Sequence, residues 1–385
     1  MEITEVKTTL VTIPVREPIR VSMGLEGRVS AIVVEVETDA GITGVGETRY
    51  SERTDAMIHN EIKHLVVGTD PFDVERTVKH YLGSGRGLWW LNAASYAITG
   101  VEMACWDIIG KSLRTPIYRL MGGRFREKVP ITAFLGIDRP EKVVKEAVTA
   151  VEQGVKTLKL KVGRDADEDV EIVRQVREAV GDDIQIRVDP NQAWSPPTAI
   201  RQIRKISRFD PQYIEQPIPR WDLKGLAHVR RKVSVPIAIC EGVLSPYRAM
   251  EVITHRAADF ISTDPARLGG LLWFKKVSAM AEAADIPVIL HVSNCGVSVA
   301  AWLHLATSTP NVMYANDIPP VGADFGRSAV DDIIMTPFKH EEGYLKAPEG
   351  PGLGVAIDRD RLRKYADLYR KTPKKKPEMY FPPAY

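Results

Sequence analysis

Acidic and basic side chains recur at the carboxyl ends of short apolar segments in the middle of the chain. Successive members of this set are separated by roughly 23–28 residues, about the length of one strand followed by one helix. In order they are Lys159 and Lys161, Asp189, Glu215, Glu241, Asp264 and His291. Polar groups at equivalent points of a repeating structure indicate one shared site, because unrelated surface charges would not keep this spacing.

Three members of the set, Asp189, Glu215 and Glu241, would stand on three adjacent strands. Carboxylates crowded together repel one another unless a cation neutralises them. Oxygen ligands suit hard ions, and Mg²⁺ keeps coordination positions for water and substrate. The alternative is three unrelated acids, each at the surface or in a salt bridge. The regular spacing favours a Mg²⁺ site.

Lys159 and Lys161 flank one apolar residue, so the alternation of a strand points both ammonium groups to the same side. Beside a second cation and a divalent metal, Lys161 would lose its proton more easily and could act as a base. Two exposed lysines on an edge strand are the alternative. The position of LKLKV inside the repeat favours the base.

Asp264 and His291 end consecutive strand candidates, where neighbouring side chains can form a hydrogen bond. The carboxylate would orient the imidazole and stabilise its protonated form, which gives a second acid/base group. A buried histidine with satisfied hydrogen bonds is the alternative. With Lys161 on the other side of the carboxylates, a substrate could have its α-carbon approached from two faces.

Asn191, just after Asp189, could touch the substrate or only cap a loop.

Eight short apolar runs are separated by segments with helical periodicity, which predicts parallel strands with right-handed crossovers. These runs cover residues 129–135, 157–162, 184–189, 212–216, 235–240, 259–264, 287–291 and 312–316. Eight evenly spaced units favour an α/β fold of the closed (β/α)8 TIM type over an open doubly wound sheet. We predict that this barrel spans residues 126–339.

The first third of the chain has a different texture. Residues 2–15 and 29–36 are β-branched, GITGVGE (41–47) follows as a turn with a return strand, and residues 93–113 form a long apolar helix. Strands followed by helices predict a separate α+β domain over residues 1–125.

Composition limits the function classes. The 385 residues carry a formal net charge of +2, with 44% hydrophobic and 26% charged residues. This balance argues against a nucleic-acid partner, which needs a concentrated positive field. No apolar run reaches the ~18 residues of a membrane span, and the amino-terminal segment lacks a signal peptide's apolar core. The cysteines, Cys105, Cys240 and Cys295, are few and far apart, so we expect reduced thiols in a cytoplasmic protein.

The polar set resembles the enolase superfamily, in its mandelate racemase-like branch. The family's Lys-x-Lys motif matches Lys159 and Lys161, its metal triad matches the three carboxylates, and its Asp–His dyad matches Asp264 and His291. The resemblance covers nearly the whole chain, and it implies a modified barrel, a capping domain completed by residues 340–385, and a Lys or His base with Mg²⁺ stabilising an enediolate.

Within the branch the chain looks most similar to glucarate dehydratase and related acid-sugar dehydratases. That similarity lies in GITGVGE (41–47), GRGL (85–88), ITGVE (98–102), SN (293–294) and PGLGVAID (351–358), whereas ANDIPP replaces those enzymes' Asp-Thr-His element. The resemblance implies Mg²⁺-dependent dehydration of an aldarate or aldonate to a 2-keto-3-deoxy acid.

Two alternatives to dehydration stay open. The same bases could racemise or epimerise a 2-hydroxy acid, and a non-catalytic barrel could bind acidic metabolites. We expect the protein to form a homo-oligomer and to bind a small-molecule carboxylate as its substrate. Specificity should come from loops of the capping domain, with Met23 and Arg49 as substrate contacts, and Asn316 or Asp317 should add a contact at the end of the eighth strand.

Overall fold

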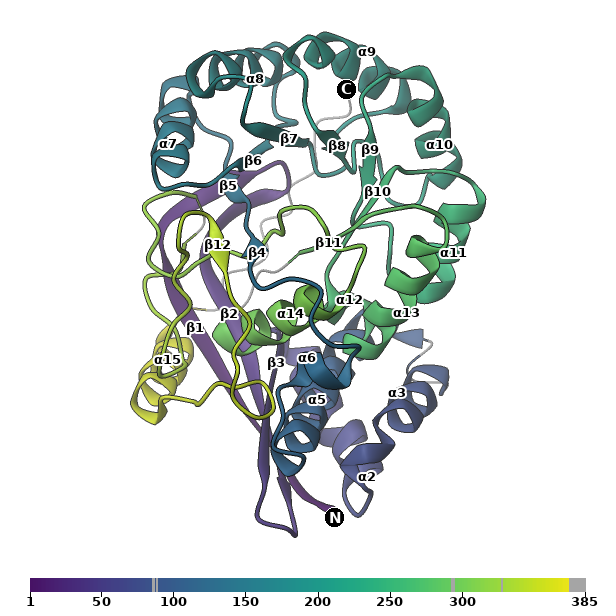
Figure 1. Ribbon diagram of the computed structural model, residues 1–385, viewed down its shortest axis with the longest axis vertical. Coiled ribbons are helices and arrows are strands. Elements are labelled where there is room, and N and C mark those ends of the chain that lie inside the picture. Colours follow the sequence, from purple (N-terminus) through teal and green to yellow (C-terminus); the bar gives the residue numbers. More distant parts are fainter. Residues whose placement is uncertain (85–86, 88, 292–294, 327, 374–385) are drawn as a thin grey trace.

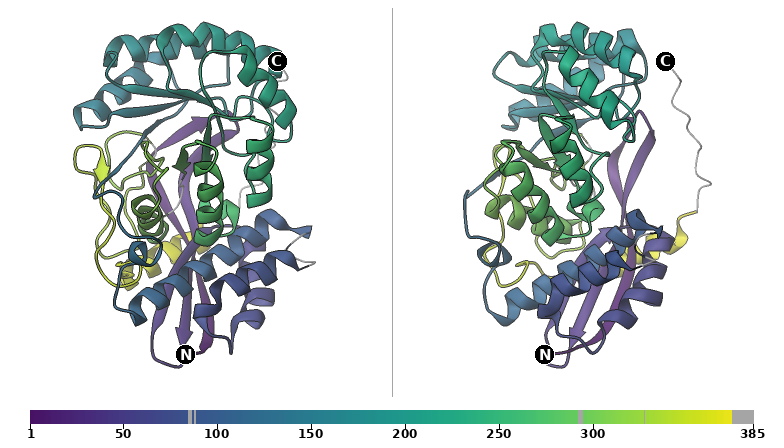
Figure 2. Two further views of the ribbon diagram at one scale, coloured as in Figure 1. Left: turned by 45° about the vertical axis from the view of Figure 1, so that its right-hand side comes forward. Right: turned by 90° about the vertical axis from the view of Figure 1, so that its right-hand side faces the viewer.

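The computed structural model describes residues 1–84, 87, 89–291, 295–326 and 328–373. Its amino-terminal part is an antiparallel sheet in which β2 lies between β1 and β3. The strands are β1 (Ile3–Val21), β2 (Gly24–Thr38) and β3 (Thr43–Arg49). The sheet confirms the predicted strands, but β1 and β2 run further than expected. They form one long hairpin that leaves the capping sheet and reaches the barrel (Figures 1 and 2).

Helices cover one face of this sheet. In chain order they are α1 (Glu52–Met57), the π-helical turn Ile58–Ile62, α2 (Lys63–Val66), the 3-10 turn Pro71–Asp73, α3 (Val74–Gly83), α5 (Leu91–Ser112) and α6 (Ile117–Leu120). The long α5 lies directly on β3. A Cβ at Gly44 would stand 2.1 Å from Ala104 O, and one at Gly46 would stand 1.9 Å from Gly100 O. The glycines of GITGVGE therefore allow the close approach of strand and helix.

A curled sheet of parallel strands follows, and among the described residues its seven strands are hydrogen-bonded in chain order. They are β5 (Ala133–Leu135), β6 (Thr157–Lys161), β7 (Gln185–Asp189), β8 (Tyr213–Glu215), β9 (Ile237–Ile239), β10 (Phe260–Thr263) and β11 (Val288–Leu290). The connecting elements are α7 (Pro140–Glu152), α8 (Ala166–Val180), α9 (Pro196–Ile206) with the 3-10 turn Ser207–Phe209, α10 (Leu223–Lys232), α11 (Pro246–Thr254), α12 (Pro265–Leu268), α13 (Leu271–Glu282) and α14 (Gly296–Ser308). The helices surround the strands (Figure 1), as the alternating pattern predicted.

The barrel closes through single bridges rather than through the eighth strand that we predicted over 312–316. Asn316 makes a parallel bridge to Ile131, and the next residue, Asp317, makes one to His291. The predicted first strand is also divided, because β4 (Val129–Pro130) pairs antiparallel with β12 (Tyr344–Leu345) and only β5 joins the barrel. The fold is thus a modified (β/α) barrel with an amino-terminal capping domain.

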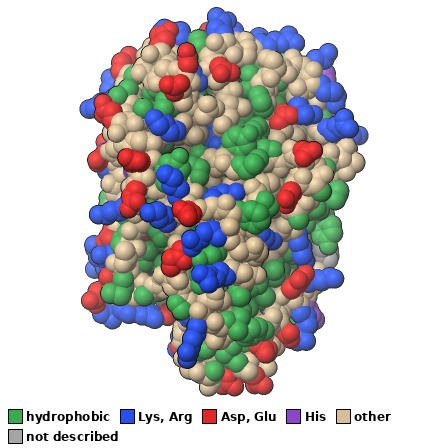
Figure 3. Space-filling view, in the orientation of Figure 1, with side chains coloured by type: hydrophobic (Ala, Val, Ile, Leu, Met, Phe, Trp, Pro, Cys, Tyr) green, Lys and Arg blue, Asp and Glu red, His purple; other side chains and the backbone are tan. Residues whose placement is uncertain are grey.

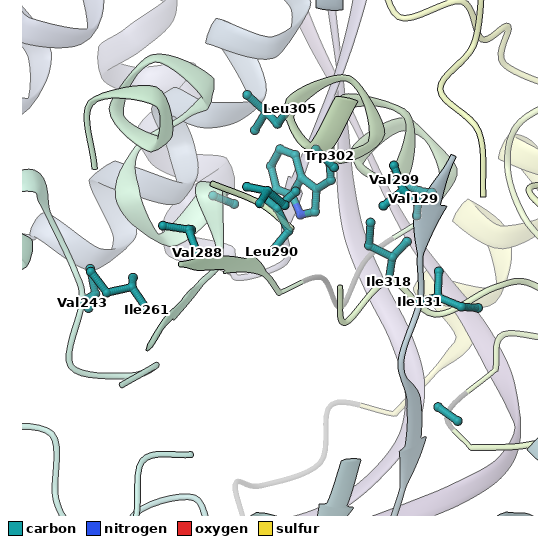
Figure 4. Close-up of a cluster of buried hydrophobic side chains, with 14 of the residues drawn as sticks. Val129, Ile131, Val243, Ile261, Val288, Leu290, Val299, Trp302, Leu305 and Ile318 are labelled. Atoms are coloured by element: carbon teal, nitrogen blue, oxygen red, sulfur yellow. The ribbon is translucent and has the colours of Figure 1, made fainter. Parts of the chain in front are cut away.

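Apolar side chains fill the space between the strands and the helices. Trp302 and Leu305 of α14 lie over Val288 and Leu290 of β11 (Figure 4), and all four side chains are buried. Each such side chain contributes about 1.5–3 kcal/mol relative to exposure. Although the strands are short, this burial holds their carboxyl ends in place.

The end of the described chain returns to the capping sheet. Helix α15 (Arg359–Lys371) packs on β1, and Tyr369 Oη lies 2.8 Å from Tyr50 Oη. The helix begins at Asp358, whose carboxylate accepts hydrogen bonds from the amides of Asp360 and Arg361.

On the face seen in Figure 3, charges of both signs are interspersed. No helix within the described ranges combines the length and the apolar character that crossing a membrane would require.

Two carboxyl groups of the capping domain are buried where it contacts the barrel. Glu47 of β3 accepts hydrogen bonds from the amides of Cys295 (2.6 Å) and Ser298 (3.1 Å) at the start of α14. Glu102 of α5 likewise accepts from the amides that begin α13. Burial raises the pKa of each group to about 7, although the hydrogen bonds oppose that shift.

These raised pKa values predict a pH dependence of stability. Between the ordinary value of 4.5 and about 7, the folded protein binds more protons at Glu47 and Glu102 than the unfolded chain does. The free energy of unfolding should therefore fall as pH rises through this window, on the order of 3 kcal/mol for each group. Urea unfolding of wild type and of the Glu47→Gln/Glu102→Gln double variant at several pH values measures the difference. The double variant should show the flatter profile, whereas Glu75→Gln, at an exposed position of α3, should follow the wild type.

Candidate active site

The strand-end residues predicted from the sequence gather at the carboxyl ends of the barrel strands. Lys159 and Lys161 occupy β6 and Asp189 ends β7, and all three side chains are buried. The Lys161 ammonium lies 2.6 Å from Asp189 Oδ2 and 2.8 Å from Asn191 Oδ1. The spacing of about one strand–helix unit therefore brought residues distant in sequence into direct contact.

Lys159 lies at the centre of a cluster of carboxylates. Its Nζ donates to Glu215 Oε1 at 2.6 Å and to Asp317 Oδ2 at 2.7 Å, and Asp189 Oδ2 is 3.3 Å away. Burial by itself lowers the pKa of this ammonium, but the three carboxylates outweigh it and hold the pKa well above its usual value. Lys159 is therefore a permanent positive charge, suited to neutralising acids and not to taking a proton.

The two lysines also determine the pKa of Asp189. Burial works to raise its pKa, yet the neighbouring ammonium groups of Lys161 and Lys159 bring the pKa below its usual value. For Glu215 burial prevails and raises the pKa despite Lys159. Two carboxylates on neighbouring strands are thus held in different electrostatic states, which is common where charge is concentrated for chemistry.

The third predicted metal ligand keeps a free oxygen. Glu241 Oε1 accepts a hydrogen bond of 2.9 Å from Asn191 Nδ2, whereas the buried Oε2 has no partner among the described residues. An unsatisfied buried carboxylate oxygen is costly, so it is an open position for a cation. In the described part of the chain no cluster of three His, Cys, Asp or Glu side chains already has metal-binding geometry. Lys159 and Lys161 engage Glu215 and Asp189 instead. The all-oxygen donor set nonetheless fits Mg²⁺.

His291 follows β11 and pairs with a different acid from the one that we predicted. Its Nδ1 lies 3.5 Å from Asp317 Oδ2, and the backbones of these two residues form a bridge. The Asp264 carboxylate instead caps α12, because its Oδ1 accepts from the Ala266 amide at 2.9 Å. The predicted Asp264–His291 dyad stays a prediction: in this structure the bridge places Asp317 beside the imidazole, and Asp264 Oδ1 caps the start of α12.

Asp317 is shared between this imidazole and Lys159. Its burial works to raise the pKa, but Lys159, His291 and Arg187 together bring the pKa far below its usual value. The Asp317 carboxylate thus stays ionised 3.5 Å from the imidazole of His291. The arrangement therefore gives His291 the partner that an acid/base residue needs.

Lys161, Glu241, His291 and Asp317 open onto a cavity of about 270 Å³ between the barrel and the capping domain, whereas Lys159, Asp189 and Glu215 lie behind its lining. Its lining from the barrel is Thr132, Phe134, Lys161, Asn191, Gln192, Arg220, Cys240, Glu241, Arg267, His291, Asp317, Pro319, Pro320 and Phe325, and from the capping domain Val21, Met23, Glu26, Arg49 and Tyr96. Met23, at the tip of the β1–β2 hairpin, and Arg49, at the end of β3, are thus brought to the same cavity as Lys161 and His291.

Phe134 of β5 joins the two candidate bases. Its ring centroid is 4.4 Å from Lys161 Nζ and 6.3 Å from the centroid of the His291 ring, which stacks on it at 19°. An aromatic face attracts a cation and excludes water. Sequence reasoning missed Phe134 because an aromatic residue in an apolar run looks like any core residue.

Asn316 does not reach the cavity. It is fully buried. Its side-chain oxygen Oδ1 accepts a hydrogen bond from the Leu290 backbone amide at 2.8 Å, and its Nδ2 donates to the Tyr314 carbonyl at 3.0 Å. Of the two residues predicted for a contact at the end of the eighth strand, Asp317 therefore lines the cavity, while the Asn316 side chain is held by backbone groups.

Gln192, Arg220 and Arg267 also line the cavity and were not predicted. One signal was visible only in the backbone: Asn191 and Gln192 are consecutive residues with positive φ, 44° and 70°. Such strain is retained where the surrounding structure fixes it, often at functional sites.

Of the sequence motifs, residues 85, 86 and 88 of GRGL and both residues of SN (293–294) lie outside the described residues.

Comparison with known proteins identifies the family of the chain. The family model described as "Mandelate racemase / muconate lactonizing enzyme, N-terminal domain" matches residues 3–122, and the one described as "Enolase C-terminal domain-like" matches residues 142–361. The N-succinyl-L-Arg/Lys racemase of Bacillus cereus is 31% identical over 96% of this chain and 100% of its own length. The D-galactonate dehydratase of Klebsiella pneumoniae is 30% identical, over 88% of this chain and 91% of its own.

A solved structure of a related enzyme has the same fold. The dipeptide epimerase of Enterococcus faecalis, complexed with Mg and the dipeptide L-Leu-L-Tyr, superposes with a TM-score of 0.85 at 28% identity, over 92% of this chain and 100% of that one. The chain belongs to the mandelate racemase / muconate lactonizing enzyme family of the enolase superfamily.

Proposed function

We propose that this enzyme is a Mg²⁺-dependent dehydratase of an acid sugar, an aldarate or an aldonate. One observation carries the proposal. Lys161 and His291 line the same cavity as Glu241, whose Oε2 is buried without a hydrogen-bond partner among the described residues. A base, an acid and a position for a cation around one cavity are what removal of an α-proton from a carboxylate requires.

Asp189, Glu215 and Glu241 would hold the ion. When bound, it would supply a Lewis acid for the substrate carboxylate. Lys159 would stay protonated among the acids and balance their charge, as its contacts indicate. The residues that move protons are then Lys161 and His291.

The reaction needs one proton removed and one supplied. Lys161 would take the proton from the α-carbon, or His291 would do so for the opposite configuration. In the first case protonated His291, beside Asp317, would give its proton to the departing β-hydroxyl, which leaves as water. The electrons of the α-carbon–hydrogen bond form the new double bond, and the enol tautomerises to a 2-keto-3-deoxy acid.

The remaining lining of the cavity favours a long, polar substrate. Gln192 and Tyr96 offer groups that can bond sugar hydroxyls. Arg49 and Arg220 also line the cavity. Guanidinium groups in a cavity suit a second carboxylate. This supports an aldarate over an aldonate.

The test is a screen of aldarates and aldonates with the purified enzyme and Mg²⁺. We expect 2-keto-3-deoxy product from at least one compound, detected chemically and by proton NMR in D₂O. Exchange of the α-proton with inversion but without a keto product would contradict dehydration. A Lys161→Ala/His291→Asn double variant serves as the inactive control.

Epimerisation is the second candidate function, and the placement of the two bases favours it. Lys161 and His291 reach the cavity from different strands, and both lie close to the ring of Phe134. One base could remove the α-proton and the other could return a proton to the opposite face. A substrate without a β-hydroxyl would then invert, so the same NMR experiment on 2-hydroxy acids decides between the two. A binding barrel without catalysis would give neither product nor exchange.

A further inference from the structure

The junction of α12 and α13 is held by the capping domain. Helix α13 begins after Gly270, which has no side chain to cap the free amides of its first turn. The Glu102 carboxylate of α5 does so instead: Oε2 accepts from the Leu271 amide at 2.9 Å and Oε1 accepts from the Leu272 amide at 3.0 Å. A carboxylate at this point also interacts favourably with the helix dipole.

The backbone at the junction is shaped for this contact. Gly269 and Gly270 both have positive φ, 108° and 121°. A Cβ at Gly270 would stand 2.4 Å from Glu102 Oε2, so any larger residue would displace the carboxylate. Trp106, one turn along α5, fixes the carboxylate from the other side by donating to Oε1 at 3.1 Å.

Helix α12 lies between this contact and the cavity. Thr99, one turn before Glu102 on α5, donates to the Ala266 carbonyl at 3.2 Å. Arg267, the next residue, reaches the cavity and donates to the Cys240 carbonyl at 3.0 Å. Another turn back on α5, Tyr96 lines the cavity itself. One face of α5 thus follows the α12–α13 junction up to the cavity wall.

We propose that Glu102 is a positioning residue of the active site, which places the Arg267 guanidinium in the cavity by fixing the α12–α13 junction from the capping domain. This goes beyond the proposed function in assigning a role to ITGVE (98–102), and it rests on that function only for the identity of the substrate. Arg267 is the group that touches the substrate, and Glu102 acts through it.

The structure supplies a matched control. Glu47 forms the same kind of interdomain cap on the next helix of the barrel, α14, through the amides of Cys295 and Ser298. Both carboxylates are fully buried and carry the same raised pKa. Glu102→Gln and Glu47→Gln therefore remove equivalent contacts, but only the first contact supports the segment that carries Arg267.

The first readout is independent of any substrate. In the wild type the amides of Arg267 and Leu268 both bond the Asp264 carbonyl. Glu102→Gln should speed hydrogen exchange at these two amides about tenfold or more, and Glu47→Gln should leave them unchanged. If exchange rises only at Leu271 and Leu272, the carboxylate is a local helix cap and the proposal fails. It also fails if Glu47→Gln has the same effect, because the contact would then act through domain docking as a whole.

The second readout separates substrate binding from turnover. With a turned-over aldarate, Glu102→Gln should raise KM about as much as Arg267→Gln and change kcat less, and Glu102→Asp should lie between wild type and Glu102→Gln. A uniform loss of kcat with unchanged KM would overturn the proposal. If no acid sugar is turned over, the proposed function fails while hydrogen exchange still decides the role of Glu102. Because Glu102→Gln keeps the size of the side chain, it should fold, and its Tm verifies this.

Discussion

Replacing Lys161 by alanine should stop turnover of substrates with one configuration at the α-carbon. Lys161 lines the cavity within 4.4 Å of the Phe134 ring and contacts Asp189 and Asn191. A positioned general base contributes about 10²- to 10⁴-fold to the rate, so kcat should fall by about that factor. Exchange of the α-proton with D₂O, followed by NMR, measures the step directly, even for a compound that is not dehydrated.

The matched experiment replaces His291 by asparagine. Its loss should abolish exchange of the opposite configuration, for which His291 is the base. It should also abolish dehydration of the configuration that Lys161 deprotonates, because the departing hydroxyl loses its proton donor. Lys205→Ala is the control, since this lysine forms a half-exposed surface pair with Asp167 at 3.1 Å, on the outer helix α9. Unchanged kinetics in both Lys161→Ala and His291→Asn would overturn the assignment of the site.

Replacing Lys159 by methionine should destabilise the protein strongly, and Mg²⁺ should restore much of the loss. The substitution leaves Asp189, Glu215 and Asp317 buried without their shared counter-charge. Removing one member of a buried ion pair costs about 3–5 kcal/mol. A divalent cation bound by Asp189 and Glu215, together with Glu241, would offset that repulsion, so the gain in Tm on moving from EDTA to Mg²⁺ should be larger in the variant than in the wild type.

Lys142→Met is the control for this experiment. Lys142 also contacts two carboxylates, Glu17 at 3.0 Å and Asp138 at 2.9 Å, but it is 39% exposed. Exposed pairs contribute about 0–1 kcal/mol, so its Tm should change little and should not depend on Mg²⁺. Equal Tm values for Lys159→Met in EDTA and in Mg²⁺ would show that the carboxylates do not share a cation site.

The barrel and much of its polar set could be predicted because the signals are local. Each of Lys161 and Asp189 ends a run of buried strand residues, and parallel strands bring such ends to one edge of the sheet. The capping sheet was equally visible in the β-branched residues of β1 and β2. Periodicity and strand length together therefore determine which residues meet, even before any contact is known.

Asp317 shows where this reasoning stops. The last apolar run ends at Asn316, so the sequence left the contact open between Asn316 and Asp317, and successive residues of an extended segment face opposite sides. Only the bridges to Ile131 and His291 fix which side faces the cavity. Those bridges depend on closure of the barrel, which joins its first and last segments and leaves no local mark in the sequence.

Glu102 was hidden for a different reason. It lies in a helix whose other residues are mostly buried and apolar, so its chemistry resembles that of an isolated buried acid. Its partners, the amides of Leu271 and Leu272, are backbone groups about 170 residues away. Side-chain types carry no information on such contacts, because every residue except proline offers the same amide.

The long β1–β2 hairpin has a consequence for how such a molecule can diverge. Its tip brings Met23 to the cavity, yet Met23 is 52% exposed and its neighbour Leu25 is 57% exposed. Exposed substitutions usually change stability by less than about 0.5 kcal/mol, whereas the strand ends hold buried charges that tolerate little. Mutations at the tip can therefore accumulate almost neutrally and alter which molecules enter, while the proton-transfer groups stay as they are. Substitutions in this hairpin are therefore the easiest route by which such an enzyme can change its substrate specificity.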